Sequence, residues 1–439
     1  MDVRGKRVTV FGMGASGVAV LDLLRRHGAR VRASDVKPRE ALPEFDAPFV
    51  PQSPEALEGC DIAVLSPGVP ADLPMFGQAR ALGTLVVGDV EAASWFLQGP
   101  VLGITGTNGK TTTTALTGHL LRTAGVPCQV GGNIGRPLAA MVGSSRKDQW
   151  NVLELSSFQL ETTRTLRVHI AAVLNITQNH LDRHHTFDAY AAAKAKILAG
   201  QQPEDHAVLN AENAASAALA GQARGRVWWF CAGGAREPGF WQQDGMLWAG
   251  GEPFMPASGI PLRGRHNLEN VLAAACCAHL AGAPLEAIRR GVHTFEGVEH
   301  RIEFVRELDG VRFYNDSKAT SVDATRKALE SFEGRLWVIL GGKDKDSDYR
   351  ELRPLLAERA RAVLLIGAAA EKIASHLEGA LPLIHCGDLR TAVETAWRKA
   401  EPGDTVLLAP ACASFDQFSG YEERGRVFKS LVHALEGRP

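Results

Sequence analysis

The segment GITGTNGKTTTT, residues 103–114, has the residue types and order of a phosphate-binding loop. It follows a short apolar segment and precedes a stretch with helical periodicity, 115–124. In such a loop the backbone N–H groups at a helix N-terminus bind an anion, a lysine (here Lys110) neutralises the outer phosphates, and a hydroxyl (here Thr111) ligates magnesium. The strict pattern requires glycine where this sequence has Ile104. An ordinary glycine-rich turn is the alternative, but the order Gly-Lys-Thr between strand and helix favours the phosphate loop.

A second glycine-rich turn, GMGASG at 12–17, lies near the N-terminus. The sequence predicts a strand at Arg7–Phe11 before it, a helix at Val18–His27 after it, and a second strand at Arg30–Ser34 that leads to Asp35. This βαβ pattern with an acidic residue about 20 positions on is a dinucleotide fingerprint, and by itself it suggests NAD. The pattern requires only a phosphate near a helix N-terminus, so it predicts a nucleotide-binding domain without identifying the nucleotide.

Polar residues follow other predicted strands, at the strand ends where parallel sheets bind their ligands. The turn SPGVP at 66–70 exposes backbone after a strand predicted at 62–66. Glu154 lies at the end of the apolar strand predicted at 150–155. A carboxylate in this place is a suitable magnesium ligand beside the phosphate loop, and a solvated acid at a strand end is the alternative.

The segment NITQNHLDRHH at 175–185 follows the next predicted strand. A zinc site is compatible with its ligand types, whereas the nearby phosphate loop favours a hard cation or a phosphate. For each histidine a surface position is the alternative, and His180 has the position best suited to a site. The side chains of interest are His180, Asp182, His184 and His185.

Cationic residues occur further along the chain. Lys194 lies on an Ala-rich predicted helix, where spacing alone predicts a solvated side chain. The segments HRIEF at 300–304 and YNDSKAT at 314–320 open the last third of the chain, and their Arg and Lys suit phosphates or carboxylates. The residues of interest in these segments are His300, Arg301, Asp316, Lys318 and Thr320.

The segment GGKDKDSDY at 341–349 resembles a calcium loop in its alternating aspartates. The template fails, because Tyr349 stands where glycine is required and Leu355 where the final glutamate belongs. We therefore expect no calcium site. The segment PACASFDQF at 410–418 follows the last predicted strand and supplies Ser414 and backbone N–H groups.

These residues require elements that position them, and the pattern predicts three α/β domains. We expect an N-terminal Rossmann-like nucleotide fold at 1–98, a central P-loop ATPase-like parallel sheet at 99–294, and a C-terminal Rossmann-like open α/β sheet at 295–439. A Gly- and Trp-rich stretch, 241–255, indicates a small β excursion, and 266–282 indicates a helix. The remaining predicted strands are 84–87, 171–175, 207–210, 227–231, 311–315, 336–340, 362–366 and 405–409.

Composition narrows the classes of protein. Hydrophobic residues make up 45% of the chain and charged residues 22%, as in soluble globular proteins. A net charge of −1 gives no electrostatic case for nucleic acid or an anionic membrane. The seven cysteines form no Cys-x-x-Cys pair, which favours a reduced cytoplasmic compartment. No apolar run reaches the length of a membrane span, and the N-terminus enters a strand without a signal peptide.

From the residues alone, the chain is an ATP-using transferase or ligase that holds a second, nucleotide-like substrate on its N-terminal domain. An NAD-dependent oxidoreductase is a rival interpretation of GMGASG and Asp35, but it leaves the phosphate loop and Glu154 without a role. A non-catalytic nucleotide switch is a second rival, and such a switch needs no second and third substrate domain.

The whole chain resembles the Mur ligase family. The family motifs occur in order, and GTNGKT at 106–111 is the family form of the ATP loop, which explains Ile104. The segments NDSKAT and ACAS-x-DQF resemble the members that add D-glutamate to UDP-N-acetylmuramoyl-L-alanine, a cytoplasmic step of peptidoglycan precursor synthesis. The resemblance implies ATP, two magnesium ions, a carbamate on Lys194, a monomer, and no nucleic acid or membrane insertion. The further motifs are LSPGV, GGNIG, LELSSFQLE, NHLDR, GRHNLEN, HR and LGGKDKD.

The resemblance also implies roles for individual residues, with Lys110, Glu154, His180 and Lys194 as the catalytic group. Two departures from the family pattern affect them: the segment from His180 to Lys194 is one residue short, and Tyr421 replaces a familiar Phe. The implied ATP ligands are Gly106, Thr107, Asn108, Gly109, Lys110, Thr111, Thr112, Asn267, Asn270, His300, Arg301 and Asp316. The implied UDP-sugar ligands are Gly14, Ala15, Ser16, Asp35, Lys37, Ser66, Gly68 and Asn133. The implied D-glutamate ligands are Lys318, Thr320, Lys345, Ser414, Phe415 and Tyr421, and the implied metal ligands are Thr111, Glu154, His180 and Lys194.

Overall fold

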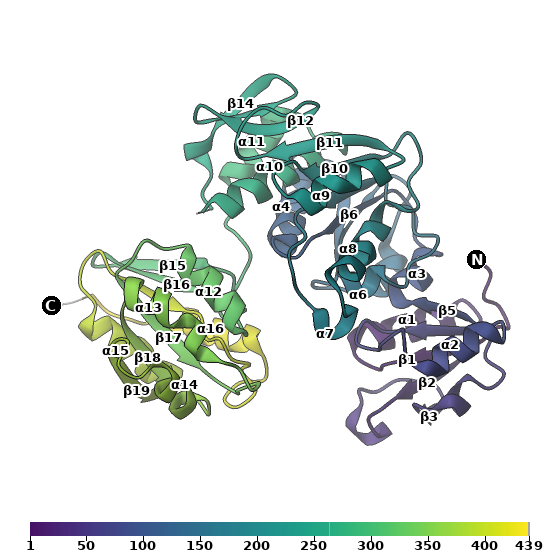
Figure 1. Cartoon of the computed structure of the whole chain (residues 1–439), viewed down its shortest axis with the longest axis horizontal. Coiled ribbons are helices and arrows are strands. Elements are labelled where there is room, and N and C mark those ends of the chain that lie inside the picture. Colours follow the sequence, from purple (N-terminus) through teal and green to yellow (C-terminus); the bar gives the residue numbers. More distant parts are fainter. Residues whose placement is uncertain (263, 438–439) are drawn as a thin grey trace. The chain divides into compact units, whose positions relative to one another are not determined.

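The computed structural model describes residues 1–262 and 264–437, with the side chain of Asp182 left out. The chain divides into two compact units, Met1–Phe295 and Glu296–Pro439 (Figure 1). The first unit contains two sheets and the second unit contains one. The α/β fold of three domains expected from the sequence is confirmed, and the domain boundaries themselves stay predictions.

The N-terminal sheet has five parallel strands in the order β3-β2-β1-β4-β5. The strand order reverses at β1, so the carboxyl ends of β1 and β4 flank the point where such sheets bind ligands. The strands are β1 (Arg7–Phe11), β2 (Arg30–Asp35), β3 (Phe49–Pro51), β4 (Ile62–Leu65) and β5 (Leu85–Gly88). The helices are α1 (Ala15–Arg26), α2 (Pro74–Ala81) and α3 (Asp89–Ser94).

The central sheet has nine strands in the order β14-β13-β12-β11-β10-β9-β6-β8-β7. The seven strands that lie next to one another in the order β12-β11-β10-β9-β6-β8-β7 all pair in parallel. Strand β13 pairs antiparallel with β12 and with β14. The sheet is therefore parallel at its core, and the predicted β excursion is the antiparallel edge. The strands are β6 (Val101–Thr105), β7 (Cys128–Gly132), β8 (Trp150–Glu154), β9 (Ile170–Val173), β10 (His206–Asn210), β11 (Arg226–Cys231), β12 (Gly239–Gln243), β13 (Met246–Ala249) and β14 (Glu252–Pro256).

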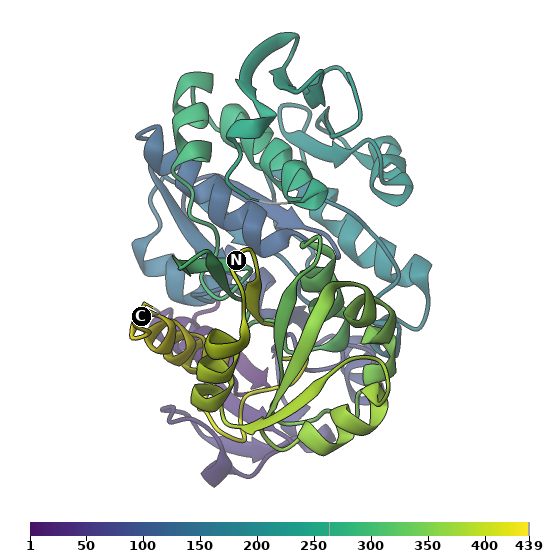
Figure 2. The ribbon, with the colours of Figure 1, turned by 90° about the vertical axis from the view of Figure 1, so that its left-hand side faces the viewer.

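Two long helices of the central domain, α4 and α10, lie side by side (Figures 1 and 2). A nearly continuous buried stretch on α10, Asn270–Ala278, explains the contact, because a helix that is apolar on most sides must be covered. Because the phosphate loop leads directly into α4, the packing of α10 against α4 also supports that loop. The helices of this domain are α4 (Lys110–Thr123), α5 (Leu138–Met141), α6 (Ser157–Leu160), α7 (Leu181–His184), α8 (Phe187–Ala195), α9 (Ala214–Ala218), α10 (Arg265–Leu280) and α11 (Leu285–His293).

The buried carboxylate of Glu91 joins the two sheets of the first unit. Glu91 lies on α3, is 1% exposed, and accepts hydrogen bonds from the backbone N–H groups of Arg164 (2.8 Å), Thr165 (2.9 Å) and Leu166 (3.2 Å). One hydrophobic core also runs from Val10 of β1 to Leu153 of β8. The N-terminal and central domains are therefore packed together through both polar and apolar contacts.

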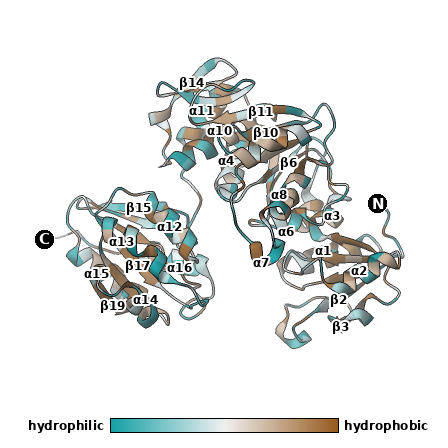
Figure 3. Cartoon of the chain, in the orientation of Figure 1, coloured by the Kyte–Doolittle hydropathy of each residue, from teal (hydrophilic) through white to brown (hydrophobic). Residues whose placement is uncertain are grey.

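The second unit is an open sheet in the order β15-β16-β20-β17-β18-β19, parallel except for β15. Separate apolar clusters cover its two faces, and Figure 3 shows apolar colour on the central strands and teal on the outer helices. The strands are β15 (Glu303–Leu308), β16 (Val311–Asn315), β17 (Leu336–Gly341), β18 (Ala360–Ile366), β19 (Leu383–Gly387) and β20 (Thr405–Leu408). The helices are α12 (Val322–Glu330), α13 (Arg353–Arg359), α14 (Ala370–Leu377), α15 (Leu389–Lys399) and α16 (Tyr421–His433).

The strands predicted by their bounds are all present, and their ends differ from the prediction by two residues at most. Helix α1 begins at Ala15, three residues before the predicted start, and α4 begins at Lys110 rather than at 115. Four strands were not predicted: β3, β7, β15 and β19. Among the described residues no helix combines the length and the apolar composition that a membrane span requires.

Candidate active site

The phosphate loop connects β6 to α4, and its two glycines Gly106 and Gly109 have positive φ angles. Gly106 has φ +156° and Gly109 has φ +82°, values that L side chains rarely adopt. The segment after β9 holds the loop, because Asn175 accepts hydrogen bonds from the backbone N–H groups of Thr107 (2.8 Å, to its carbonyl) and Asn108 (2.9 Å, to its Oδ1). The loop predicted from the sequence therefore has its expected place between strand and helix.

Lys110 folds back on the loop that precedes it. Its amine donates hydrogen bonds to the carbonyls of Gly106 (2.8 Å) and Thr107 (2.9 Å). The hydroxyl-bearing residues that follow, Thr111 and Thr112, are buried at the start of α4. This is the position from which a lysine and a hydroxyl serve a bound polyphosphate.

Asn270 of α10 supports the same loop. Its Oδ1 accepts a hydrogen bond of 3.3 Å from Thr113, and its Nδ2 donates one of 3.1 Å to Asn267. A Cβ atom on Gly109 would lie 2.2 Å from Asn270 Oδ1, so only glycine fits there. Of the two residues expected near ATP, Asn270 therefore contacts the start of α4 after the phosphate loop, and Asn267 contacts Asn270.

Glu154 ends β8 and is 2% exposed. Its Oε1 accepts a hydrogen bond of 2.8 Å from Asn133 Nδ2, and its Oε2 is buried without a hydrogen-bond partner. A buried carboxylate oxygen without a partner is costly, so it marks a place for a cation or a donor. The interpretation of Glu154 as a solvated strand-end acid is wrong.

Lys194 is buried, although spacing alone predicted a solvated side chain. It is 1% exposed, and its amine donates a hydrogen bond of 2.8 Å to the carbonyl of Gly106. Its Nζ lies 4.7 Å from the centre of the Tyr190 ring, and the Tyr190 hydroxyl lies 3.1 Å from Thr107 Oγ1. Burial, with the charge of Lys110, lowers the pKa of the Lys194 amine to about 6. The Lys194 side chain therefore contacts the phosphate loop from α8. Lys196, two residues further along the chain, is exposed.

The three histidines of 175–185 have different surroundings. His180 precedes α7 with φ 53°, is exposed, and its ring lies 4.9 Å from that of Phe158. His184 is buried, stacks on Phe158, and bonds Ser157 Oγ at 3.0 Å, and burial lowers its pKa. His185 is exposed beside Asp72.

The zinc interpretation of this segment finds no support in the described residues. Within them, no group of three or more His, Cys, Asp or Glu side chains is placed to hold a metal ion. The side chain of Asp182, another candidate ligand, lies outside the description. His180 is exposed, and its ring lies 6.2 Å from that of Tyr190, whose hydroxyl contacts Thr107 of the phosphate loop.

The N-terminal loop, which follows β1, is bound by residues from the ends of two other strands, β2 and β4. Asp35 accepts hydrogen bonds from the backbone N–H groups of Met13 (2.6 Å) and Lys37 (2.9 Å), and Ser66 Oγ donates to the carbonyl of Gly12 at 2.6 Å. Asp35 and Ser66 therefore shape the loop that they were predicted to accompany. Their direct contact with a nucleotide stays a prediction. The exposed members of the predicted set are Gly14, Ala15, Lys37, Gly68 and Asn133, and Ser16 is partly buried.

In the second unit, His300 is a buried residue at φ 65°. Its Nδ1 lies 2.9 Å from Asn315 Nδ2, and burial lowers its pKa. Asp316 is also buried, which raises its pKa to about 7 in spite of the Arg301 charge nearby. These groups sit at the end of β16, where ligands of parallel sheets bind.

The side chains predicted for an amino-acid pocket come from three loops of this unit. Lys318 Nζ lies 5.8 Å from the ring centre of Tyr421, and that ring packs edge-on to His300. Lys345 and Phe415 are exposed, Ser414 is buried, and Thr320 is half-buried. The structure brings Lys318, Tyr421 and His300 together, and the roles of all six predicted residues stay predictions.

Arg424 is a residue that sequence reasoning missed. It is 1% exposed on the first turn of α16, and its guanidinium donates to Ser317 Oγ (3.0 Å), Ser317 O (2.9 Å) and Cys412 O (3.2 Å). It therefore ties the loop of Lys318 to the loop of Ser414. Its place six residues after the end of the ACAS-x-DQF segment gave no signal, because an arginine on a helix is ordinarily exposed.

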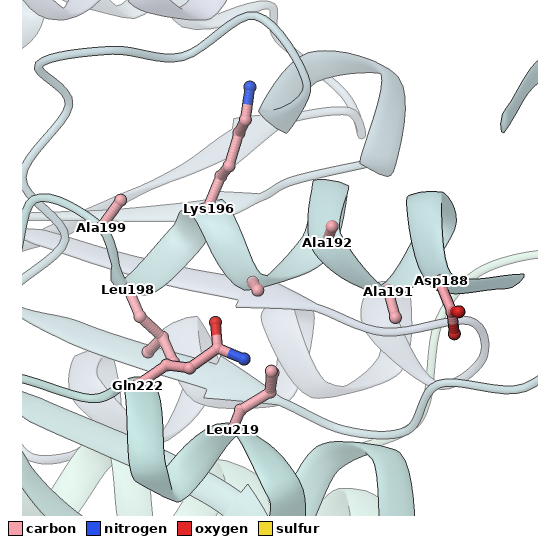
Figure 4. A pocket seen from close by; sticks show the side chains of 9 residues that line it. Asp188, Ala191, Ala192, Lys196, Leu198, Ala199, Leu219 and Gln222 are labelled. Carbon is pink, nitrogen blue, oxygen red and sulfur yellow. The ribbon is translucent and has the colours of Figure 1, made fainter.

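A hollow of about 360 Å³ lies beside α8, lined by Ala191 and Ala195 of this helix and by Lys196 of the turn that follows it (Figure 4). Leu219 and Gln222, on the turn after α9, form its other wall. In Figure 4 the Lys196 side chain extends away from this hollow. None of the predicted ATP, UDP-sugar or metal ligands lines it, so it is separate from the phosphate loop.

Three family profiles match the chain along its length. The profile described as "Mur ligase MurD-like, N-terminal domain" matches residues 6–88, "Mur ligase middle domain" matches 104–278, and "Mur ligase, glutamate ligase domain" matches 300–412. The "UDP-N-acetylmuramoylalanine–D-glutamate ligase" of Solibacter usitatus is 57% identical over 439 residues, covering 99% of both chains. The protein of the same name from Acidobacterium capsulatum is 52% identical, covering 100% of this chain and 98% of the relative.

Solved structures of lower identity share the fold. UDP-N-acetylmuramate–alanine ligase from Thermotoga maritima aligns with a TM-score of 0.62 at 18% identity, covering 98% of this chain and 99% of that one. A pseudomurein peptide ligase type C from Methanothermus fervidus aligns with a TM-score of 0.59, also at 18% identity, over 98% and 100%. With full-length relatives above half identity and profiles that match each of its three sheets, the chain belongs to the Mur ligase family.

Proposed function

We propose that the chain is an ATP-dependent ligase that joins D-glutamate to UDP-N-acetylmuramoyl-L-alanine in the cytoplasm, as a monomer. The observation that carries the proposal is the 57% identity, over 99% of both chains, with a relative of that name. The phosphate loop with Lys110, the buried Lys194 and Glu154 supports the ATP-dependent part.

The nucleotide substrate fits the N-terminal loop. The free N-terminus of α1, at Gly14–Ser16, is a place for the diphosphate, because backbone N–H groups and the helix dipole favour an anion there. Asp35 and Lys37 would contact the uridine of this substrate, and Ser66, Gly68 and Asn133 would lie close to the same substrate. Since the chain has a separate ATP loop, the N-terminal domain is available for the second nucleotide.

The residues near the phosphate loop fit magnesium. The buried Oε2 of Glu154 lacks a partner, Thr111 follows Lys110, and carboxylate and hydroxyl oxygens are ligands that magnesium prefers. We propose Thr111 and Glu154 for one ion and His180 with a carbamylated Lys194 for a second. When bound, magnesium would neutralise charge on the ATP phosphates.

The Lys194 amine is suited to carbamylation. Carbon dioxide adds only to a neutral amine, and the pKa of about 6 keeps most of the Lys194 amine neutral at pH 7. The product is an anion with two oxygens, which suits a hard cation, whereas an ammonium group would repel it.

The reaction follows from these positions. The alanine carboxylate would attack the γ-phosphorus of ATP, displace ADP and form an acyl phosphate, while Lys110 stabilises charge on the transferring phosphoryl group. The D-glutamate amine would then attack the acyl phosphate and release phosphate. The Lys318 and Lys345 charges suit a substrate with two carboxylates.

Product analysis tests the proposal. Purified protein with UDP-N-acetylmuramoyl-L-alanine, D-glutamate, ATP and magnesium should form the amide, ADP and phosphate, and ADP release should require both other substrates. Equal use of L-alanine or L-lysine in place of D-glutamate would overturn the assignment of the amino acid. Tight NAD binding without ligation would instead favour an oxidoreductase.

A further inference from the structure

Asp344 is surrounded by donors that bind both of its carboxylate oxygens. Its Oδ1 accepts hydrogen bonds from the Tyr349 hydroxyl (2.7 Å) and from the backbone N–H of Ser347 (3.2 Å). Its Oδ2 accepts one of 2.7 Å from the Lys372 amine, which also reaches Asp346 at 3.2 Å. Asp344 immediately precedes Lys345, whose side chain is exposed.

The Tyr349 hydroxyl belongs to an ordered chain of donors. Tyr349 is fully buried, and its oxygen lies 3.0 Å from the sulfur of the buried Cys412. Because the single phenol proton goes to Asp344, the thiol donates to the phenol oxygen. Burial raises the pKa of Cys412 to about 11 and raises that of Tyr349 as well, so both groups keep their protons.

This chain connects two of the loops assigned to the amino-acid pocket. Cys412 lies two residues before Ser414, and Asp344 lies one residue before Lys345. The same loops pair through their backbones, since the Lys343 N–H donates to the carbonyl of Ala413 at 2.8 Å. Lys372 approaches from α14, which carries none of the predicted ligands.

The positive charge of Lys372 neutralises the carboxylate of Asp344. An unpaired carboxylate next to Lys345 in the chain would attract that lysine and compete with a carboxylate of the substrate. With Asp344 satisfied by Lys372 and Tyr349, and Asp346 paired with Lys372, the Lys345 charge is left for the ligand.

We propose that Lys372 and Tyr349 are positioning residues of the amino-acid pocket, which hold Asp344 so that Lys345 is available to a carboxylate of the incoming acidic amino acid. The inference rests on the proposed function, because it takes D-glutamate as that amino acid. Neither residue needs to touch the substrate.

The test is a set of steady-state measurements on the full chain with D-glutamate, ATP and the muramoyl nucleotide. Lys372→Met should raise the KM for D-glutamate about tenfold, the scale of one charge interaction of about 1.4 kcal/mol, with the KM for ATP unchanged within about twofold. Adding both Asp344→Asn and Asp346→Asn to Lys372→Met removes the two carboxylates that Lys372 pairs with, so this triple variant should return to within about threefold of the Asp344→Asn, Asp346→Asn pair alone. Tyr349→Phe, which keeps the ring and removes the hydroxyl, should raise the same KM by a smaller factor.

The matched control is Lys327→Met, because Lys327 forms an ion pair with Asp323 on α12 of the same unit. An unchanged KM for D-glutamate in Lys372→Met, or a triple variant no better than Lys372→Met, would overturn the proposal. Because the Lys372 side chain is one-third exposed, we expect Lys372→Met to fold, and Lys372→Gln is a second substitution with the same expected outcome. If wild-type protein forms no amide from D-glutamate, the proposed function itself fails, which is a distinguishable result.

Discussion

Lys194 and Lys110 both donate a hydrogen bond of 2.8 Å to the same acceptor, the carbonyl of Gly106. Two amines at one carbonyl repel each other when both are charged, and the Lys110 charge contributes to the low pKa of Lys194. The loop thus holds one charged amine and one amine that is mostly neutral at pH 7. The charged amine suits the ATP phosphates, and the neutral amine is free to react with carbon dioxide.

The first prediction concerns the modified lysine. Lys194→Ala should lower turnover about a hundredfold or more, because it removes the proposed metal-binding carbamate. Short-chain carboxylic acids such as formate or acetate should restore part of the activity by occupying the empty space. The matched control is Lys196→Ala, which lies two residues away and is exposed. A severe loss in Lys196→Ala instead, or a bare Lys194 amine by mass spectrometry of active protein, would contradict the assignment.

The second prediction concerns the stability of the unmodified protein in buffer free of carbon dioxide. The pKa of the Lys194 amine is about 6 in the folded chain and 10.5 when unperturbed. Between these values the unfolded chain binds the extra proton, so the stability contributed by this site rises with pH, by up to about 1.4 kcal/mol per pH unit. Lys194→Met lacks this dependence. Its free energy of unfolding should therefore exceed that of wild type at pH 7, and the difference should shrink toward pH 9 in urea titrations. A constant difference across this range would contradict the burial argument.

Sequence patterns predicted the strands well because most of them are short apolar runs that parallel sheets bury on both faces. The strands that were missed lie at sheet edges, such as β7 (CQVGG), with two glycines, and β15 (EFVREL), with three charges. Edge strands pair on one side only, so they need no apolar run.

The burial of Lys194 could not be read from its helix. Alanines surround it on α8, and they give no apolar stripe that separates a buried face from an exposed one. Only its resemblance to a family motif selected it. The roles of Glu91, Arg424 and Tyr349 were missed for another reason: most of their partners are distant in sequence, as in the bonds from Glu91 to residues 164–166.

The third prediction concerns the joint between the two domains of the first unit. In Glu91→Gln, one carboxylate oxygen becomes an NH₂ group that faces backbone N–H donors, so at least one buried donor loses its acceptor. The expected cost is about 2 kcal/mol of unfolding free energy, measured as a lower urea midpoint. Glu44→Gln, an exposed acid of the same domain, is the control and should leave the midpoint unchanged. A midpoint for Glu91→Gln equal to that of the control would show that the contacts at Arg164–Leu166 contribute little.

The last prediction concerns magnesium at Glu154. Glu154→Gln keeps an oxygen for the Asn133 amide, which now donates to Oε1 at 2.8 Å, and removes the negative charge. If the unpartnered Oε2 is a magnesium ligand, the magnesium concentration for half-maximal activity should rise at least about tenfold, and turnover at saturating magnesium should fall about a hundredfold. Glu212→Gln is the matched control, because Glu212 also follows a strand of the central sheet but is paired with Arg265. Asn133→Ala separates the two parts of the argument: it leaves the charge but frees Oε1, so it should lower magnesium affinity less than Glu154→Gln. Equal magnesium dependence in Glu154→Gln and wild type would remove Glu154 from the metal site, and the buried oxygen would then need a donor from the substrate or from water.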